Sequence, residues 1–297
     1  MNKQTRSRRS VKEPRIIPRG RQPRRALVRG QDGTRWRDVY HLVLTAPWWA
    51  FFVGAASVFA LVNGIFALLY MIDPQGIDHA HGFGDFFLFS VQTLGSANYT
   101  VMMPRSTYAN TVVSVEAFFG ILNLALVTGV AFARFSRPFA RILFSKVAVI
   151  APFDGVPTLM FRAANQRGNQ ILNAEISVSL ARQSTTREGI AMRRFEELKL
   201  VRARTPLFGL SWTVMHAIDK TSPLHEATAE SLFDAQGELI ILLSGTDDAL
   251  ADIIYARHSY TPDEILWDRR FVDVLSLAPS GRRIVDLNRF HDTEALS

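Results

Sequence analysis

Cysteine is absent from this sequence of 297 residues. The absence excludes disulfide frameworks, thiolate zinc sites, iron–sulfur clusters and cysteine nucleophiles. Charged side chains are also scarce, at 21% of residues, whereas hydrophobic side chains make up 48%. So much apolar material supports a sizeable core and more than one domain, which excludes disorder over the whole chain.

Acidic residues are nearly absent from the first 37 positions, where thirteen Lys and Arg residues accompany only Glu13 and Asp32. Because apolar residues are few there as well, we expect residues 1–33 to form a basic, disordered tail. Such a tail suits nucleic acid and an anionic membrane surface equally well, and a merely solvated tail is as good an interpretation.

Motifs for catalysis are missing. The sequence contains no Walker A loop, no complete dinucleotide fingerprint and no G-x-S-x-G elbow. His79 and His81 have no third ligand at metal-binding spacing, so we expect no metal site there. These absences predict that the protein is not an enzyme.

Two long apolar segments with almost no charge indicate a protein that spans a membrane. Residues 42–72 contain no charged side chain, and residues 106–133 contain one, Glu116. Both segments exceed the roughly 20 residues that a helix needs to cross a membrane, whereas a signal peptide would be shorter and nearer the start. Pro47 suits the first turn of the first span. Before it, residues 34–46 mix charged and apolar side chains at helical spacing, which indicates a helix lying in the membrane interface.

The connection between the two spans contains a third apolar segment, residues 86–95, which is too short to cross. Backbone at membrane depth is tolerated only where protein or a water-filled cavity satisfies it, so we expect a re-entrant segment within residues 84–103. Asp85 is the expected N-cap of its helix. Because Lys and Arg crowd the outer flanks of both spans, we expect both termini to be cytoplasmic.

The sequence changes character after residue 148. Ala174, Ile176, Val178 and Leu180 alternate with polar residues, and short apolar runs are separated by turn signals. This pattern favours an antiparallel β-sandwich over residues 149–297. A linker at residues 136–148 would join it to a two-span domain at residues 47–135.

The order of these parts, together with several motifs, resembles the prokaryotic inward-rectifier potassium channel (KirBac) family. The matching motifs are WRDVYHLVL with the following APWW, FFLFSVQT, TLMFRAAN, LSWTVMHAID, YARHSYTPDEI and, at the end of the second span, ARFSRP. The resemblance implies two transmembrane helices with a re-entrant pore helix, followed by a cytoplasmic immunoglobulin-like β-sandwich. It further implies a homotetramer in the cell (inner) membrane that transports potassium passively and is gated by the cytoplasmic domain and by lipid.

The resemblance places the ion-binding selectivity filter at residues 96–100. The family has T-[IV]-G-Y-G there, whereas this chain has Ser96, Ala97, Asn98, Tyr99 and Thr100. Glycine permits the left-handed backbone that aligns filter carbonyls, and a β-branched residue such as Thr100 resists it. We therefore expect the filter to depart from the aligned conformation and selective potassium conduction to be weak or absent. The alternative function is a non-selective or non-conducting, membrane-anchored binding or regulatory protein.

The resemblance also assigns roles within the second span. Glu116 stands behind the filter as its support, bonded to the pore helix or loop; a carboxyl simply kept protonated is the alternative. Leu124 occupies the site of the acidic rectification residue and predicts weak block by polyamines. Phe132 is expected to form an apolar gate where the inner helices converge, and Gly120 is a candidate hinge.

Basic residues flank both spans at the expected cytoplasmic surface. Arg37, Arg134 and Arg137 are the expected ligands for anionic lipid headgroups, with ordinary positive-inside topology as the alternative. The expected partners are thus membrane lipids, monovalent cations and further copies of the chain, and no nucleic acid. No cofactor is expected, potassium being the permeant ion.

Overall fold

The computed structural model describes residues 15–17, 39–97, 101–136, 140–277 and 283–296. Their contacts divide the chain into two compact units. One is helical and lies within residues 29–137, and the other contains residues 138–297 together with the N-terminal residues 15–17.

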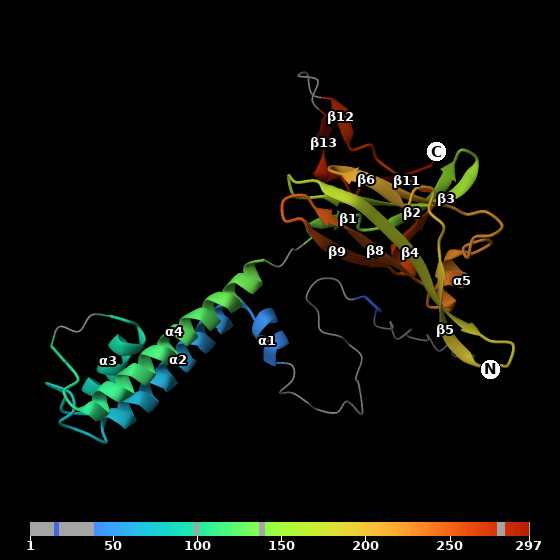
Figure 1. Cartoon of the computed structure of the whole chain (residues 1–297). Coiled ribbons are helices and arrows are strands. Elements are labelled where there is room, and N and C mark those ends of the chain that lie inside the picture. The colour runs from blue at the N-terminus through green and yellow to red at the C-terminus, as the bar shows by residue number, and fades with distance from the viewer. Residues whose placement is uncertain (1–14, 18–38, 98–100, 137–139, 278–282, 297) are drawn as a thin grey trace, which may run out of the picture. The chain divides into compact units, whose positions relative to one another are not determined.

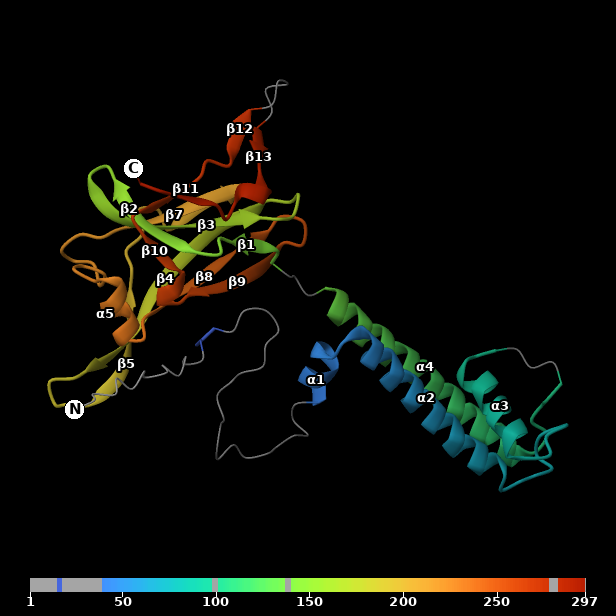
Figure 2. The same ribbon diagram turned by 180° about the vertical axis from the view of Figure 1, so that it is seen from behind.

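The helical unit is built around two long helices that lie side by side, with a short helix beside them (Figures 1 and 2). The long helices have 23 and 29 residues, which correspond to about 35 and 44 Å and exceed the roughly 30 Å of a hydrocarbon core. The short helix has 12 residues, about 18 Å, and cannot cross. The four helices are α1 (Val39–Thr45), α2 (Trp48–Tyr70), α3 (Phe83–Leu94) and α4 (Thr107–Phe135).

The helix starts follow from local capping. α2 begins directly after Pro47, one residue from the predicted position. The Ser106 hydroxyl accepts the Ala109 N–H at 2.9 Å and starts α4. The prediction that Asp85 is the N-cap of α3 is wrong, because the N-cap is Gly82 and Asp85 lies in the first turn. From there the Asp85 carboxylate reaches back to accept the N–H of His81, the residue before the N-cap, at 2.9 Å.

The β unit is a sandwich of two five-stranded sheets (Figure 1). The first has the order β1-β3-β2-β10 with β7 also paired to β3, and the second has the order β5-β4-β8-β9 with β6 also paired to β4. β10 and β2 pair in parallel, whereas the other pairs in these sheets are antiparallel. The first sheet comprises β1 (Ile142–Phe144), β2 (Ala148–Phe153), β3 (Val156–Asn165), β7 (Ser211–Ala217) and β10 (Ile265–Trp267). The second comprises β4 (Ile171–Thr185), β5 (Ala191–Glu197), β6 (Arg204–Phe208), β8 (Glu238–Asp247) and β9 (Asp252–Tyr260).

The core of the β unit lies between these sheets. The alternating residues of β4 are buried as predicted, and they pack with side chains from β3, β7 and β8. Asp154 and Gly155 both have positive φ, of 51° and 78°, in the two-residue connection of β2 to β3. That geometry is the type I′ turn that suits the twist of a hairpin. The sequence therefore predicted this layer and its turn correctly.

The sandwich begins earlier than predicted. β1 falls within the expected linker 136–148, because Ile142–Phe144 pair with the end of β3. Smaller elements complete the unit and include two further two-stranded sheets. They are α5 (Ala229–Asp234), β11 (Arg269–Phe271) with β14 (Thr293–Ala295), β12 (Leu275–Leu277) with β13 (Arg283–Val285), and short 3-10 helices at Pro262–Glu264 and Leu287–Arg289.

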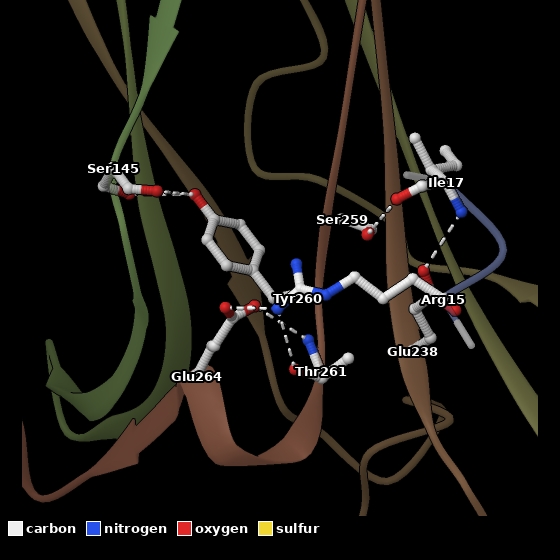
Figure 3. A network of polar contacts seen from close by, with 8 residues as sticks. All are labelled: Arg15, Ile17, Ser145, Glu238, Ser259, Tyr260, Thr261 and Glu264. Atoms are coloured by element: carbon white, nitrogen blue, oxygen red, sulfur yellow. Dashed lines mark hydrogen bonds and ion pairs between the residues drawn. The ribbon is translucent and has the colours of Figure 1, made fainter. Parts of the chain in front are cut away.

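Three residues of the basic tail are held against the sandwich (Figure 3). The backbone N–H groups of Ile16 and Ile17 donate to the buried Glu238 carboxylate, at 2.9 and 3.4 Å. The Arg15 guanidinium pairs with the Glu264 carboxylate. The expectation of a wholly disordered tail over residues 1–33 is therefore wrong for these three residues, and its remaining residues lie outside the described part of the chain.

Candidate functional site

A polar cluster of four buried residues joins α2, α3 and α4. It consists of Asn63, Tyr70, Ser90 and Glu116, and each is at most 1% exposed. The Tyr70 hydroxyl donates to one oxygen of the Glu116 carboxyl at 2.5 Å, and the Ser90 hydroxyl contacts the other. Ser90 also lies 2.9 Å from Asn63 Oδ1. Glu116 thus contacts α3 through Ser90, and its expected role as support of the filter stays a prediction.

Gly120 lies one turn after Glu116 on the same face of α4. A Cβ atom at this position would lie 2.6 Å from the Leu94 carbonyl oxygen at the end of α3. Only glycine allows so close an approach of the two backbones. Glu116 with Ser90 and Gly120 with Leu94 therefore form two contacts, one helical turn apart, that hold α3 against α4. α4 is continuous from Thr107 to Phe135, and the role of Gly120 as a hinge stays a prediction.

The C-terminus of α3 forms a Schellman motif. The Ser96 N–H donates to the Thr93 carbonyl at 3.1 Å, and the Ala97 N–H donates to the Gln92 carbonyl at 2.8 Å. Ser96 has φ of 53°, the left-handed conformation that this motif requires. Two of the five expected filter residues thus complete the end of the helix. Asn98, Tyr99 and Thr100 lie outside the described residues.

The outer surface of α4 is apolar over most of its circumference. Leu124 is 69% exposed and Phe132 is 71% exposed. Exposed apolar surface of this extent needs lipid or another chain to cover it. Neither predicted pore residue contacts the polar cluster, and their roles in conduction stay predictions.

Arg134 lies at the end of α4, where it binds protein groups. Its guanidinium donates to the carbonyls of Val43 and Ala46, at the end of α1 and just beyond it. It also lies 4.6 Å from the centroid of the Trp48 ring, and the residue is only 7% exposed. Two of the five N–H donors of the guanidinium are used in this way, and the burial of the residue argues against the expected contact of Arg134 with lipid headgroups. That contact stays a prediction. Arg37 and Arg137 lie outside the described residues.

The β unit holds a separate cavity of about 550 Å³. The guanidinium of Arg202 lies 5.0 Å from the centroid of the Trp212 ring in its wall. Among the residues that the structure describes, no group of three or more histidine or acidic side chains is arranged to hold a metal ion. His216 is buried, and its ring nitrogens contact the Lys199 carbonyl and the Ser222 hydroxyl.

The sequence pointed to Glu116 but missed its partners. Asn63 lies within the uncharged first span, and Tyr70 lies near its end. An amide at membrane depth is costly and usually functional, so Asn63 itself was a usable signal. The pairing with Tyr70 was not predictable from spacing, because 46 positions separate it from Glu116.

The family model described as the inward rectifier potassium channel C-terminal domain matches residues 142–297. The "Inward rectifier potassium channel Kirbac3.1" of Paramagnetospirillum magnetotacticum is 43% identical over 86% of this chain and 87% of its own length. The mouse "ATP-sensitive inward rectifier potassium channel 15" is 30% identical over 69% of this chain and 57% of its own length. The human "ATP-sensitive inward rectifier potassium channel 10" is 29% identical over 86% of this chain and 71% of its own length. The similarity thus extends well beyond the β unit.

Proposed function

Because this chain belongs to the inward rectifier potassium channel family, we propose that it is one subunit of a homotetrameric channel for passive potassium transport. The observation that carries this proposal is the similarity over 86% of the chain to a prokaryotic channel of the family. The order of two spanning helices with a short helix between them agrees with it.

The need for a tetramer follows from the size of the helical unit. Two long helices and one short helix cannot enclose a pore alone, so several copies must surround one axis. The exposed apolar side chains of α4 supply surface for such contacts. In the assembly we place Phe132 at the narrow apolar gate and Leu124 along the cavity.

The proposed location is the inner membrane, with both termini and the β unit on the cytoplasmic side. The excess of Lys and Arg on the outer flanks of the spans supports this orientation. Arg37 and Arg137 are the proposed contacts for anionic lipid, since Arg134 already binds backbone carbonyls. Lipid and the β unit would together regulate opening.

The non-conducting alternative is not favoured. It depended on the absent glycines at positions 98 and 100, whereas the relatives found by comparison are named as potassium channels.

Growth of a potassium-uptake-deficient bacterial strain tests the proposed conduction. Expression of the chain is expected to restore growth at low potassium, and a variant with proline at Leu124 in the middle of α4 is the matched inactive control. Equal failure of both proteins, at equal amounts in the membrane, would contradict the proposed function.

Chemical crosslinking of membranes tests the proposed assembly. The expected ladder ends at four subunits. A ladder that ends at two subunits would contradict the tetramer.

A further inference from the structure

Hydrogen-bond accounting in the polar cluster fixes the positions of its protons. Asn63 Nδ2 donates to the Phe59 carbonyl at 2.7 Å. A flipped amide would place two acceptor oxygens at that distance, so Oδ1 of Asn63 is the atom that faces Ser90. Asn63 Oδ1 lies 2.9 Å from the Ser90 hydroxyl oxygen, and one of the two must supply a proton. Because a carbonyl oxygen has none, the Ser90 hydroxyl donates to Asn63.

The Ser90 hydroxyl has one proton, and that proton is now used. Ser90 is also in hydrogen-bond contact with Glu116 Oε1. An ionised Glu116 would be an acceptor only, which would leave two oxygens in contact without a proton between them. The contact is satisfied when Glu116 supplies the proton and Ser90 accepts it.

The surroundings of Glu116 also favour a protonated, neutral carboxyl. The groups in contact with it are the Tyr70 hydroxyl from α2 and the Ser90 hydroxyl from α3, both buried. No Lys, Arg or His among the described residues pairs with its carboxyl. A buried charge without a cation is far less favourable than a neutral acid with two hydrogen bonds.

We propose that Glu116 is a neutral carboxylic acid that donates to Ser90, which in turn donates to Asn63. This buried polar chain of Glu116, Ser90 and Asn63 runs from α4 through α3 to α2, and Tyr70 donates to the second Glu116 oxygen. Asn63 is thus a positioning residue for α3, since its amide is the terminal acceptor. The effect of this buried polar chain on conduction rests on the proposed channel function. The protonation state of Glu116 does not depend on that function.

Infrared difference spectroscopy of the full chain in lipid vesicles tests the protonation state at neutral pH. Subtracting the spectrum of Glu116→Gln from that of the unmodified protein is expected to leave the C=O stretch of a carboxylic acid. Carboxylate stretches in its place would overturn the proposal. Ser114→Ala is the matched control, because Ser114 is exposed on the same helix and, within the described part of the chain, its hydroxyl bonds the Asn110 carbonyl alone.

Asn63→Leu tests the direction of the buried polar chain. Without the terminal acceptor, the Ser90 proton is released to bond Glu116, and the carboxylic-acid band is expected to weaken or shift. An unchanged band would show that Asn63 does not order the protons, which would overturn the chain.

Flux measurements test the positioning role of the buried polar chain. A glutamine side chain can donate to Ser90 and accept from Tyr70, so Glu116→Gln is expected to lose less potassium flux than Ser90→Ala and Asn63→Leu, which lose about tenfold. Equal loss in Glu116→Gln and Asn63→Leu would contradict that role. If no variant conducts, the infrared result still decides the protonation state independently of the channel function.

Discussion

At the scale of single residues, the helical unit depends on a few positions whose chemistry cannot be exchanged. Gly120 permits the backbone of α4 to reach the end of α3, and Arg134 satisfies carbonyls at the end of α1. Neither role can be predicted from the hydropathy of the sequence. Both residues lie where the end of one helix meets another helix.

Gly120→Ala is expected to destabilise the channel and reduce flux. The added Cβ would lie 2.6 Å from the Leu94 oxygen, so α3 and α4 must separate. Overpacking of this kind costs about 1–3 kcal/mol. Gly129→Ala on the same helix meets nothing within 4 Å and is the control. Thermal unfolding in detergent measures both, and equal midpoints for the two variants would contradict the close approach.

Arg134→Ala is expected to lower stability by about 2–4 kcal/mol, because two charge-assisted hydrogen bonds and a ring contact are lost. Arg134→Lys should recover only part of this, since an ammonium is a point donor without the fork of a guanidinium. Thermal midpoints measure the effect, and Arg141→Ala, an exposed neighbour in sequence, is the control. Unchanged stability with weaker binding to anionic vesicles would restore the headgroup interpretation.

At the scale of elements, the sequence predicted what its periodicity encodes. The two spans, the short helix between them and the alternating strand β4 were all found near their expected positions. Prediction from the sequence failed where contacts between distant segments determine the start or the existence of an element. The N-cap of α3 is Gly82 and not Asp85. The sequence does not reveal β1, because a three-residue strand exists only through its pairing with β3.

The candidate site shows the same division between local and tertiary information. A carboxyl deep in a span must have a partner, which the sequence alone could indicate. The identity of the partners required the fold, because Tyr70 and Ser90 come from two other helices.

The end of α3 provides a test at this scale. Ser96 adopts the left-handed conformation, which a β-branched side chain resists. Ser96→Val is therefore expected to lower stability by about 1–2 kcal/mol, whereas Ser96→Gly is not. Ala97→Val is the control, since Ala97 does not have positive φ. Equal thermal midpoints for Ser96→Val and Ala97→Val would contradict the Schellman motif.

At the scale of the whole molecule, the chain combines an apolar helical unit with a sandwich that also holds part of the N-terminal tail. Figure 3 shows Arg15 reaching Glu264 and Thr261, while Ile17 lies beside Ser259 and Glu238. Arg15 and Ile17 of the tail therefore form specific polar contacts with the sandwich.

Arg15→Glu is expected to release the N-terminal segment, because it places two carboxylates together. The double variant Arg15→Glu with Glu264→Arg should restore part of the attachment. Limited proteolysis within the first 30 residues measures the release. The same exchange at the pair Arg204 and Glu175, whose side chains are 78% and 47% exposed, is the control and should have little effect. Unchanged proteolysis of Arg15→Glu would contradict the contact.

Ion flux through the purified full chain in lipid vesicles tests the central claim most directly. Vesicles loaded with potassium and containing the protein are expected to release it faster than empty vesicles. The same preparation should lose about tenfold of this flux with Asn63→Leu, because α3 loses its hydrogen bond to α2. Potassium release no faster than from empty vesicles, from protein shown to be tetrameric, would contradict the account.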